Sequence, residues 1–186
     1  YWLVDLVKNA DGILFVVDML DPVVLKNLEA LIEKFKEKRV EFVEADPPPH
    51  QAGQPFFKKT IWVANKCEDQ EAKELVPLLE EMTENEFKLF PVSCVSNEGI
   101  TELKTKIFEM LNVVRVYSKI PHKKAEKVDP FTLKKGSVLM DLAKAVHKDF
   151  AEKLKFARIW NDHKYQGQRV NRDYVLEDED IIELHL

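Results

Sequence analysis

The chain has 186 residues, of which 45% are hydrophobic, 33% charged and 10% aromatic, and its net charge is −5. This composition is typical of a soluble globular protein with enough apolar residues for one ordinary core or two small ones. Its five glycines stand far apart, at Gly12, Gly53, Gly99, Gly136 and Gly167. A phosphate loop of the GxGxxG or GxxxxGK[ST] type needs glycines a few residues apart, because backbone N–H groups must close on the anion. The sequence therefore contains no glycine-rich phosphate loop.

Charge is distributed unevenly along the chain. Residues 1–112 contain 13 basic and 21 acidic residues, whereas residues 113–186 contain 15 and 12. This change of sign predicts two units with different surfaces, 1–112 and 113–186. No apolar run approaches the ~20 residues of a membrane span, and the two cysteines fit a reducing compartment better than a disulfide framework. We therefore expect a cytoplasmic protein without membrane contact.

The first unit alternates between strand-like and helix-like patterns. Apolar runs typical of buried parallel strands are followed three times by helical spacing of apolar residues. The predicted strands are 12–18, 60–64 and 89–93, and the predicted helices are 21–39, 71–85 and 100–111, with a kink or restart at Pro77. Strand then helix, repeated three times, predicts a doubly wound α/β sheet. Ligands of such sheets bind beyond the carboxyl ends of the strands.

Two short motifs follow two of the predicted strands. Asn65-Lys66-Cys67-Glu68 comes directly after 60–64, and Ser93-Cys94-Val95 comes at the end of 89–93. Together with the Asn97-Glu98-Gly99-Ile100 segment they resemble the N-K-x-D and S-A-x base-reading loops of P-loop GTPases. That resemblance implies a GTP or GDP site built from Asn65, Lys66, Glu68, Ser93, Cys94 and Val95.

Guanine chemistry explains why such residues suit the base. Guanine presents N1–H and N2–H₂ as adjacent donors, and one carboxylate can accept from both. By the resemblance, Glu68 takes this donor pair, Asn65 braces the loop and contacts the base edge, and the Cys94 backbone N–H faces O6. The stem of Lys66 lies along the base with its charge in solvent.

The motifs differ from the family pattern at two positions. Glu68 stands where the family usually has Asp, and the extra methylene predicts weaker guanine affinity or selectivity. Cys94 stands where Ala is commonest, a mild change if the backbone makes the contact. Two other interpretations stay open at this point: Asn65 and Asp69 as ordinary turn and N-cap residues, or the two cysteines as a metal or redox pair.

From Val113 onward the pattern is different. Strands are predicted at 113–119, 130–135, 156–160 and 181–186, and a helix begins at Ser137 and runs to about residue 150. This order predicts a small α+β domain. The segments 114–119, 156–160 and 175–182 closely resemble a TGS domain, more narrowly that of the Drg branch of Obg-related GTPases. The resemblance implies a ubiquitin-like β-grasp fold for 113–186, after a partial GTPase-type three-layer α/β unit in 1–112.

Basic residues gather around one predicted strand–loop–strand of the second unit. These residues are Arg115, Lys119, Lys123, Lys124, Lys127, Lys134 and Lys135. The family association is with RNA, ribosomes and protein partners, so this cluster is a candidate phosphate-binding surface. The alternative is a solvated face that keeps the domain soluble, and the acidic turn 177–180 is interpreted in the same way.

The sequence favours a GTP-binding protein of the Obg/Drg type, represented by its base-reading half and its TGS domain. Hydrolysis in such proteins requires a P-loop, hydroxyl ligands for Mg²⁺ and a switch segment that positions water. None of these is in the chain, so we expect no catalytic or metal-binding residues in it and no useful GTP hydrolysis. The glycine-rich loop is expected upstream of Tyr1.

A second hypothesis is a non-catalytic TGS binding module that docks on RNA or a protein partner, with a degenerate G-like half. In either case a sheet without its first strands exposes an edge and an apolar face, which predicts self-association or swapping.

Overall fold

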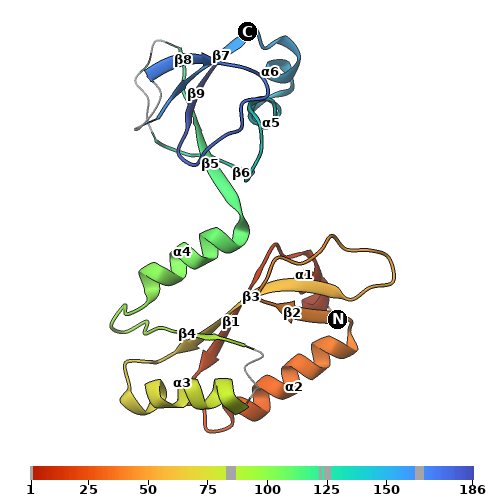
Figure 1. The fold of residues 1–186 in the computed structure, drawn as a ribbon, viewed down its shortest axis with the longest axis vertical. Coiled ribbons are helices and arrows are strands. Elements are labelled where there is room, and N and C mark those ends of the chain that lie inside the picture. The colour runs from red at the N-terminus through yellow and green to blue at the C-terminus, as the bar shows by residue number, and fades with distance from the viewer. Residues whose placement is uncertain (1, 83–86, 122, 124–126, 162–165) are drawn as a thin grey trace. The chain divides into compact units, whose positions relative to one another are not determined.

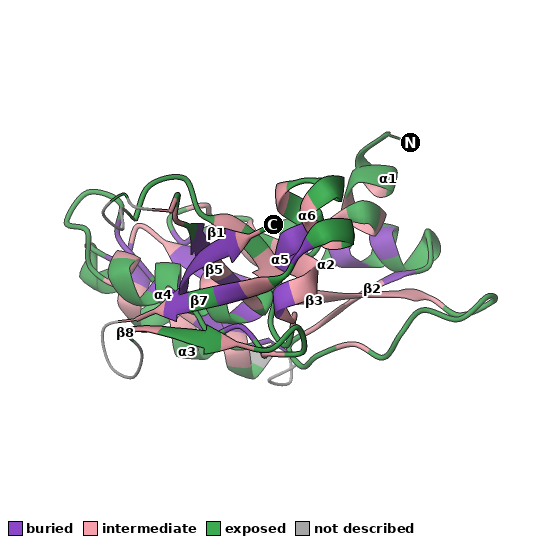
Figure 2. Cartoon of the chain, turned by 90° about the horizontal axis from the view of Figure 1, so that it is seen from above, coloured by how far each residue is buried: buried purple, intermediate pink, exposed green. Residues whose placement is uncertain are grey.

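A computed structural model of the chain describes residues 2–82, 87–121, 123, 127–161 and 166–186 (Figure 1). The chain divides into two compact units, Tyr1–Leu111 and Asn112–Leu186. Each unit has its own sheet and its own buried apolar core. The buried residues concentrate on the strands, while the outer faces of most helices are exposed (Figure 2).

The first unit contains a parallel sheet built around one long strand. Its strands are β1 (Ile13–Asp18), β2 (Val40–Val43), β3 (Phe56–Asn65) and β4 (Leu89–Pro91). Strand β3 is central, because its segment 62–64 pairs with β1 and with β4 at the same time. Strand β2 pairs with the earlier part of β3, residues 56–59.

Four helices accompany this sheet: α1 (Trp2–Asn9), α2 (Val24–Glu37), α3 (Gln70–Met82) and α4 (Ile100–Leu111). Because side chains alternate along a strand, β3 contributes to two cores. Trp62 and Ala64 pack with residues of α2 and α3 in one core. Val63 packs with Leu103 of α4 in the other. Helices therefore pack on both faces of β3, in three layers.

The second unit contains a five-stranded sheet in the order β6-β5-β9-β7-β8. Its elements are β5 (Val113–Ser118), β6 (Phe131–Lys134), α5 (Leu139–Val146), α6 (Lys148–Lys153), β7 (Phe156–Trp160), β8 (Gln166–Val170) and β9 (Ile181–His185). Strands β5 and β9 are parallel, and the other neighbours are antiparallel. Alternate residues of β5, β7 and β9 pack on Leu139 and Leu142 of α5 and form the core.

The predicted fold class is confirmed: a strand–helix α/β unit precedes a small mixed domain. Three elements were not predicted from the sequence: α1, β2 and β8. Strand β8 has the polar sequence QGQRV, which carries no apolar alternation and pairs only at the sheet edge. The short helix α1 has no buried residue among those described, so burial does not mark it.

Three helix boundaries differ from the predictions. Helix α2 begins at Val24, because the Asp21 carboxylate accepts a hydrogen bond from the Val23 N–H at 3.0 Å and closes a turn first. Helix α3 continues through Pro77 as one element. The helix predicted from Ser137 to residue 150 ends at Val146, and α6 follows because the His147 ring accepts from the Asp149 N–H at 3.2 Å.

Strand β1 has one strand neighbour, β3, among the described residues. Leu14 and Val16, on the face that β3 turns toward α4, are 40% and 55% exposed. This is the exposed apolar sheet surface on which the self-association hypothesis rests. No helix in the described ranges is long and apolar enough to span a bilayer.

Candidate functional site

The two predicted base-reading loops leave the carboxyl ends of neighbouring strands. Asn65 is the last residue of β3, and the second loop follows β4 directly. The loops are joined by a backbone hydrogen bond of 3.0 Å, in which the Cys67 N–H donates to the Val92 carbonyl. The parallel sheet therefore brings together motifs that lie 25 or more residues apart in the sequence.

The first loop contains one ion pair and one unpartnered acceptor. Lys66 adopts a left-handed backbone, with φ of 71°, and its ammonium lies 2.7 Å from the carboxylate of Asp18 at the end of β1. This hydrogen bond lowers the pKa of Asp18 and raises the pKa of Lys66. The Oδ1 atom of Asn65 is buried and has no hydrogen-bond donor among the described residues. Glu68 is exposed.

The second loop is fixed by a buried serine. The Ser93 side chain has no exposed surface, and its hydroxyl oxygen accepts from the backbone N–H groups of Val95 at 3.2 Å and Ser96 at 3.0 Å. The Ser93 N–H itself donates to the Glu98 carbonyl at 3.0 Å. The Cys94 N–H, by contrast, has no acceptor within the described parts of the chain. The turn thus holds one backbone donor at the surface.

Neighbouring contacts hold both loops in place. Asp69 accepts from the Glu71 N–H at 2.8 Å and caps the start of α3, and Lys73 pairs with Glu98 at 3.0 Å. The turn-and-cap interpretation therefore describes Asp69 correctly. A pocket of about 390 Å³ lies beside the loops, lined by residues that include Cys67, Val92 and Glu98, but none of the six predicted base-reading residues lines it.

Both cysteines are free, one buried and one exposed. Burial raises the pKa of the Cys67 thiol, which makes it less reactive. No group of three or more His, Cys, Asp or Glu side chains in the described ranges could hold a metal ion. Nothing in this geometry favours a metal or redox pair.

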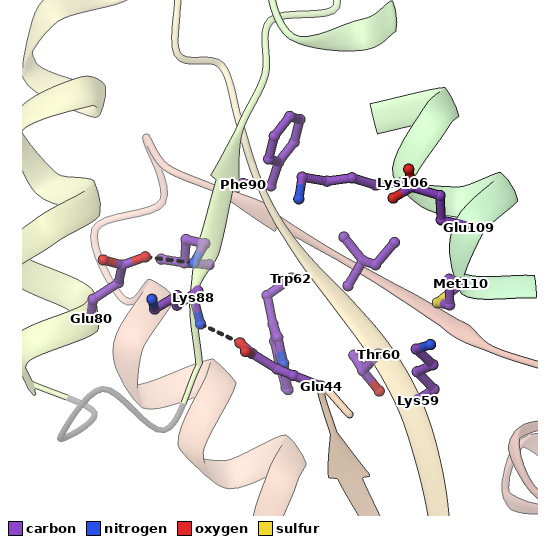
Figure 3. A pocket seen from close by; sticks show the side chains of 12 residues that line it. Glu44, Lys59, Thr60, Trp62, Glu80, Lys88, Phe90, Lys106, Glu109 and Met110 are labelled. Carbon is purple, nitrogen blue, oxygen red and sulfur yellow. Dashed lines mark hydrogen bonds between the residues drawn. The ribbon is translucent and has the colours of Figure 1, made fainter. Parts of the chain in front are cut away.

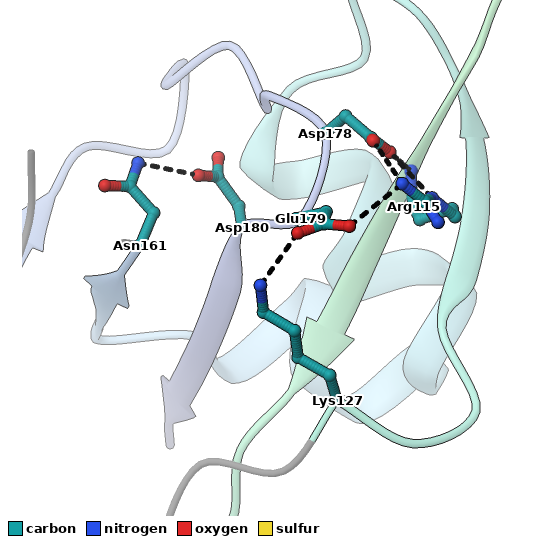
Figure 4. Close-up of polar contacts among 6 residues, drawn as sticks. All are labelled: Arg115, Lys127, Asn161, Asp178, Glu179 and Asp180. Atoms are coloured by element: carbon teal, nitrogen blue, oxygen red, sulfur yellow. Dashed lines mark hydrogen bonds and ion pairs between the residues drawn. The ribbon is translucent and has the colours of Figure 1, made fainter. Parts of the chain in front are cut away.

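Three residues of the predicted basic cluster, Arg115, Lys119 and Lys127, form ion pairs within the second unit, and Figure 4 shows those of Arg115 and Lys127. Arg115 contacts Asp178 at 2.7 Å and Glu179 at 3.0 Å, and Lys127 contacts Glu179 at 2.7 Å. Lys119 pairs with the buried carboxylate of Glu183. The hydrogen bond to Asp178 raises the pKa of Arg115 further. Burial would raise the pKa of Asp178, but the Arg115 contacts lower it.

The other members of the cluster differ from these three. Lys123, Lys134 and Lys135 are exposed and make no ion pair with the described residues. Lys124 lies outside the described residues. The seven predicted residues therefore do not form one set of free cations.

Sequence reasoning interpreted the acidic turn 177–180 as solvated, and for Asp180 this is wrong. Asp180 has no exposed surface and accepts three hydrogen bonds, from the Glu177 N–H at 2.9 Å, Asn161 at 3.2 Å and the Tyr174 hydroxyl at 3.2 Å. Burial raises the pKa of its carboxyl group. A carboxylate next to an apolar strand, as in Asp180-Ile181-Ile182, was the available signal.

A second surface was missed. Arg158 and Arg169 stand directly opposite each other on β7 and β8, and both are exposed. Arg169 lies over the Phe156 ring at 4.2 Å, and Arg158 donates to the Gly167 carbonyl at 3.3 Å. The alternation of Phe156, Arg158 and Trp160 along β7 could have indicated this face.

Comparisons with known proteins give the second unit its class. Residues 116–186 match the TGS domain family. An uncharacterized GTP-binding protein of Methanocaldococcus jannaschii is 32% identical over 134 residues, which cover 70% of this chain and 34% of that protein. The developmentally-regulated GTP-binding protein 2 homolog of Dictyostelium discoideum is 33% identical over 94 residues, covering 50% of this chain and 26% of that protein.

Solved structures support the fold. The YchF GTPase of Schizosaccharomyces pombe aligns with a TM-score of 0.60 and 13% identity over 97% of this chain and 74% of that chain. A GTP binding protein from Pyrococcus horikoshii OT3 aligns with a TM-score of 0.51 and 21% identity over 69% of this chain and 46% of that chain.

The chain therefore carries a TGS domain and is homologous to Drg/Obg-type GTP-binding proteins. It spans between a quarter and about a third of the length of the curated relatives it matches.

Proposed function

We propose that the first unit reads the base of a guanine nucleotide, as part of a GTP-binding protein whose TGS domain follows it. The observation that carries the proposal is the pairing of the two loops through Cys67 and Val92 at the carboxyl ends of β3 and β4. Parallel α/β sheets bind their ligands at this edge. The names of the relatives, GTP-binding proteins from archaea and eukaryotes, support the same nucleotide.

The polar groups at this edge fit a guanine base. Glu68 offers an exposed carboxylate for the N1–H and N2–H₂ pair, and the Cys94 N–H is a donor for O6. The buried Asn65 Oδ1 needs a hydrogen-bond donor from outside the described residues, since an unpaired buried acceptor costs free energy. Lys66, held by Asp18, keeps its charge at the rim of the site.

Calorimetric titration of the chain with GDP, GTP and ATP tests this proposal. We expect guanine-selective binding, and Glu68→Gln should weaken it roughly 10-fold or more, because a charge-assisted hydrogen bond is lost. Glu71→Gln removes the same charge from an exposed position on α3 and should leave the affinity unchanged. Equal binding of GTP and ATP, or equal effects of the two variants, would contradict the proposal.

We propose that these 186 residues read the base without making the phosphate contacts that hydrolysis needs. GTP hydrolysis requires a phosphate loop and Mg²⁺, and the chain contains no glycine-rich loop. We therefore expect the chain to bind guanine nucleotide weakly and to release no phosphate from GTP above a buffer blank. Turnover by the purified chain would contradict this division.

The second candidate function is that of a binding module, in which the TGS domain docks on RNA, at the ribosome or together with a regulatory protein. Its support is a set of exposed cations for which the described residues provide no carboxylate partner: Lys123, Lys134 and Lys135 near β5 and β6, and the facing pair Arg158 and Arg169. Like charges placed directly opposite on two strands are destabilising, so a bound anion would relieve the arginine pair.

A salt titration of binding to a single-stranded RNA separates these two surfaces. Each phosphate contact that is lost should reduce the slope of log K against log salt by ~0.7. If RNA lies on β7 and β8, the double variant Arg158→Gln/Arg169→Gln reduces the slope and Lys134→Gln/Lys135→Gln does not. The opposite result would favour the lysine surface, and unchanged slopes in both would oppose RNA docking.

Self-association and location remain proposals as well. The exposed Leu14 and Val16 favour pairing of two chains through the free side of β1. Light scattering that gives a monomer mass at high concentration would contradict this. Free Cys67 and Cys94 are consistent with the reducing cytoplasm.

A further inference from the structure

A pocket of about 620 Å³ lies beside the middle of β3 and the amino end of β4, away from the candidate base-reading loops (Figure 3). Strand β2 pairs with residues 56–59 of β3, and β4 pairs with residues 62–64, so Thr60 and Ile61 pair with neither strand. The pocket opens at this break, where the end of β2 approaches the start of β4. Its volume lies within the range of ligand-binding sites, roughly 300–1,000 Å³.

The wall of the pocket contains a buried donor without an acceptor. Trp62 lines the pocket and is only 1% exposed, and its indole N–H has no hydrogen-bond partner among the described residues. The ring is held in place by Phe15 at 4.5 Å and Phe87 at 4.1 Å between centroids. A buried unpaired N–H is costly, so it marks a position that an acceptor group would satisfy.

The charged side chains of the pocket divide into engaged and unengaged groups. Glu44 accepts from the Lys88 N–H and Glu80 from the Leu89 N–H, each at 2.7 Å, so both carboxylates hold the start of β4 (Figure 3). Lys59 is paired with Asp46 outside the pocket lining.

Two lysines on the pocket wall have no carboxylate partner in the described part of the chain. Lys88 and Lys106 form no ion pair with the described residues, and the Lys106 ammonium lies 5.4 Å from the centre of the Phe90 ring. Glu109 is the one lining carboxylate for which no contact is recorded in the described ranges. Among the described lining residues, the charges without a partner of opposite charge are thus two positive and one negative.

We propose that this pocket binds a small planar organic anion. The apolar walls, which include Trp62, Phe90 and Met110, suit a flat ring rather than a bare inorganic ion. Its anionic group accepts hydrogen bonds from Lys88 and Lys106, and its ring packs on the apolar wall of the pocket close to Trp62. The site is separate from the candidate guanine site and does not depend on it.

Benzoate is a suitable probe, followed by the indole N–H signals of the chain in ¹H–¹⁵N NMR spectra. The chain has three tryptophans, Trp2, Trp62 and Trp160, and single substitutions to Phe assign their signals. Saturable movement of the Trp62 signal alone is the expected result. No movement, or equal movement of all three signals, overturns the proposal.

Charge variants and ligand analogues test the chemistry. Lys88→Gln and Lys106→Gln should each weaken benzoate binding about threefold, and Glu109→Gln should strengthen it, whereas Lys104→Gln on the same helix serves as the unchanged control. Benzylamine carries the same ring with the opposite charge and should not bind, and inorganic phosphate should bind much more weakly than benzoate. Equal binding of benzylamine or phosphate, or benzoate affinity that is insensitive to both lysines, also overturns the proposal.

Discussion

The charged network of the TGS unit and the base-reading loops of the first unit differ in how their polar groups are partnered. In the TGS unit, buried and half-buried charges satisfy one another: Asp180 accepts three hydrogen bonds, and Arg115 is held by two carboxylates. In the first unit, the loops beyond β3 and β4 leave the Asn65 oxygen and the Cys94 N–H without partners among the described residues. Satisfied polar groups stabilise a fold, whereas fixed and unsatisfied ones indicate a ligand. The sequence shows which residues are charged or polar, but it does not show which of them already have a partner in the fold.

The largest expected effect concerns the TGS unit, where the buried Asp180 carboxylate accepts three hydrogen bonds. Asp180→Ala removes the hydrogen bonds that the buried carboxylate accepts from Asn161, Tyr174 and the Glu177 N–H, so we expect the TGS unit to lose on the order of 3 kcal/mol of unfolding free energy. Urea unfolding followed by the Trp160 indole N–H signal in ¹H–¹⁵N NMR spectra measures this change, because Trp2 and Trp62 belong to the first unit. Asp173→Ala, at an exposed position, should change it by less than about 0.5 kcal/mol. Equal losses in both variants would mean that the Asp180 network is not structural.

A backbone substitution tests the rigidity of the second loop. Gly99 has φ of 74°, and an added Cβ would lie 2.5 Å from the Pro91 carbonyl oxygen, so Gly99→Ala should destabilise the first unit by about 2 kcal/mol and weaken guanine binding. Gly53 also has a positive φ, of 90°, but an added Cβ there meets nothing within 4 Å. Gly53→Ala should therefore cost about half as much and leave nucleotide affinity unchanged. Calorimetric titration and thermal unfolding of both variants separate the cost of a side chain at positive φ, present in both, from the cost of the clash with Pro91, present only at Gly99.

The ion pairs of the TGS unit predict a pH dependence. The pKa values of Asp178 and Glu183 lie below their ordinary values of 3.8 and 4.5, since burial is outweighed by Arg115 and Lys119 respectively. The stability they contribute is therefore present above those ordinary values and is lost as pH falls through the lowered pKa values. Arg115→Gln should destabilise the unit by at most about 1 kcal/mol at pH 7, because the pair is partly exposed, and the difference should vanish near pH 2. Lys135→Gln should show no difference at either pH, and a pH-independent gap for Arg115→Gln would contradict the pairing.

The smallest expected effect concerns the base-reading loops of the first unit, where some polar groups lack a partner among the described residues. Glu68→Asp restores the residue usual at this position in the resembling GTPases, and we expect a few-fold gain in guanine affinity or in selectivity over adenine. Isothermal titration with GDP and ADP gives both numbers. A loss of affinity would indicate that the loop has adapted to the longer side chain.

Local signals in the sequence were sufficient for much of the fold. The apolar runs at β1, β3 and β4 and the helical spacing of α2 and α4 follow from periodicity alone, because each element buries one face. Strand β8 and helix α1 escaped prediction, since an edge strand and a helix without buried residues leave no apolar pattern. Helix ends were displaced where a side chain, as at Asp21 or His147, competed for backbone hydrogen bonds.

The sequence was sufficient to propose the residues of the candidate site, but not to say which polar groups are already engaged in ion pairs or hydrogen bonds. The motifs Asn65–Glu68 and Ser93–Val95 determined by themselves that polar groups follow two buried strands, since strand burial and turn chemistry are local properties. Only the tertiary structure decided which charges remain available, because ion pairs such as Arg115 with Asp178 join residues 63 positions apart. The pocket beside Trp62 is likewise a tertiary property: it exists because β2 ends and β4 begins at different points along β3, which no local pattern records.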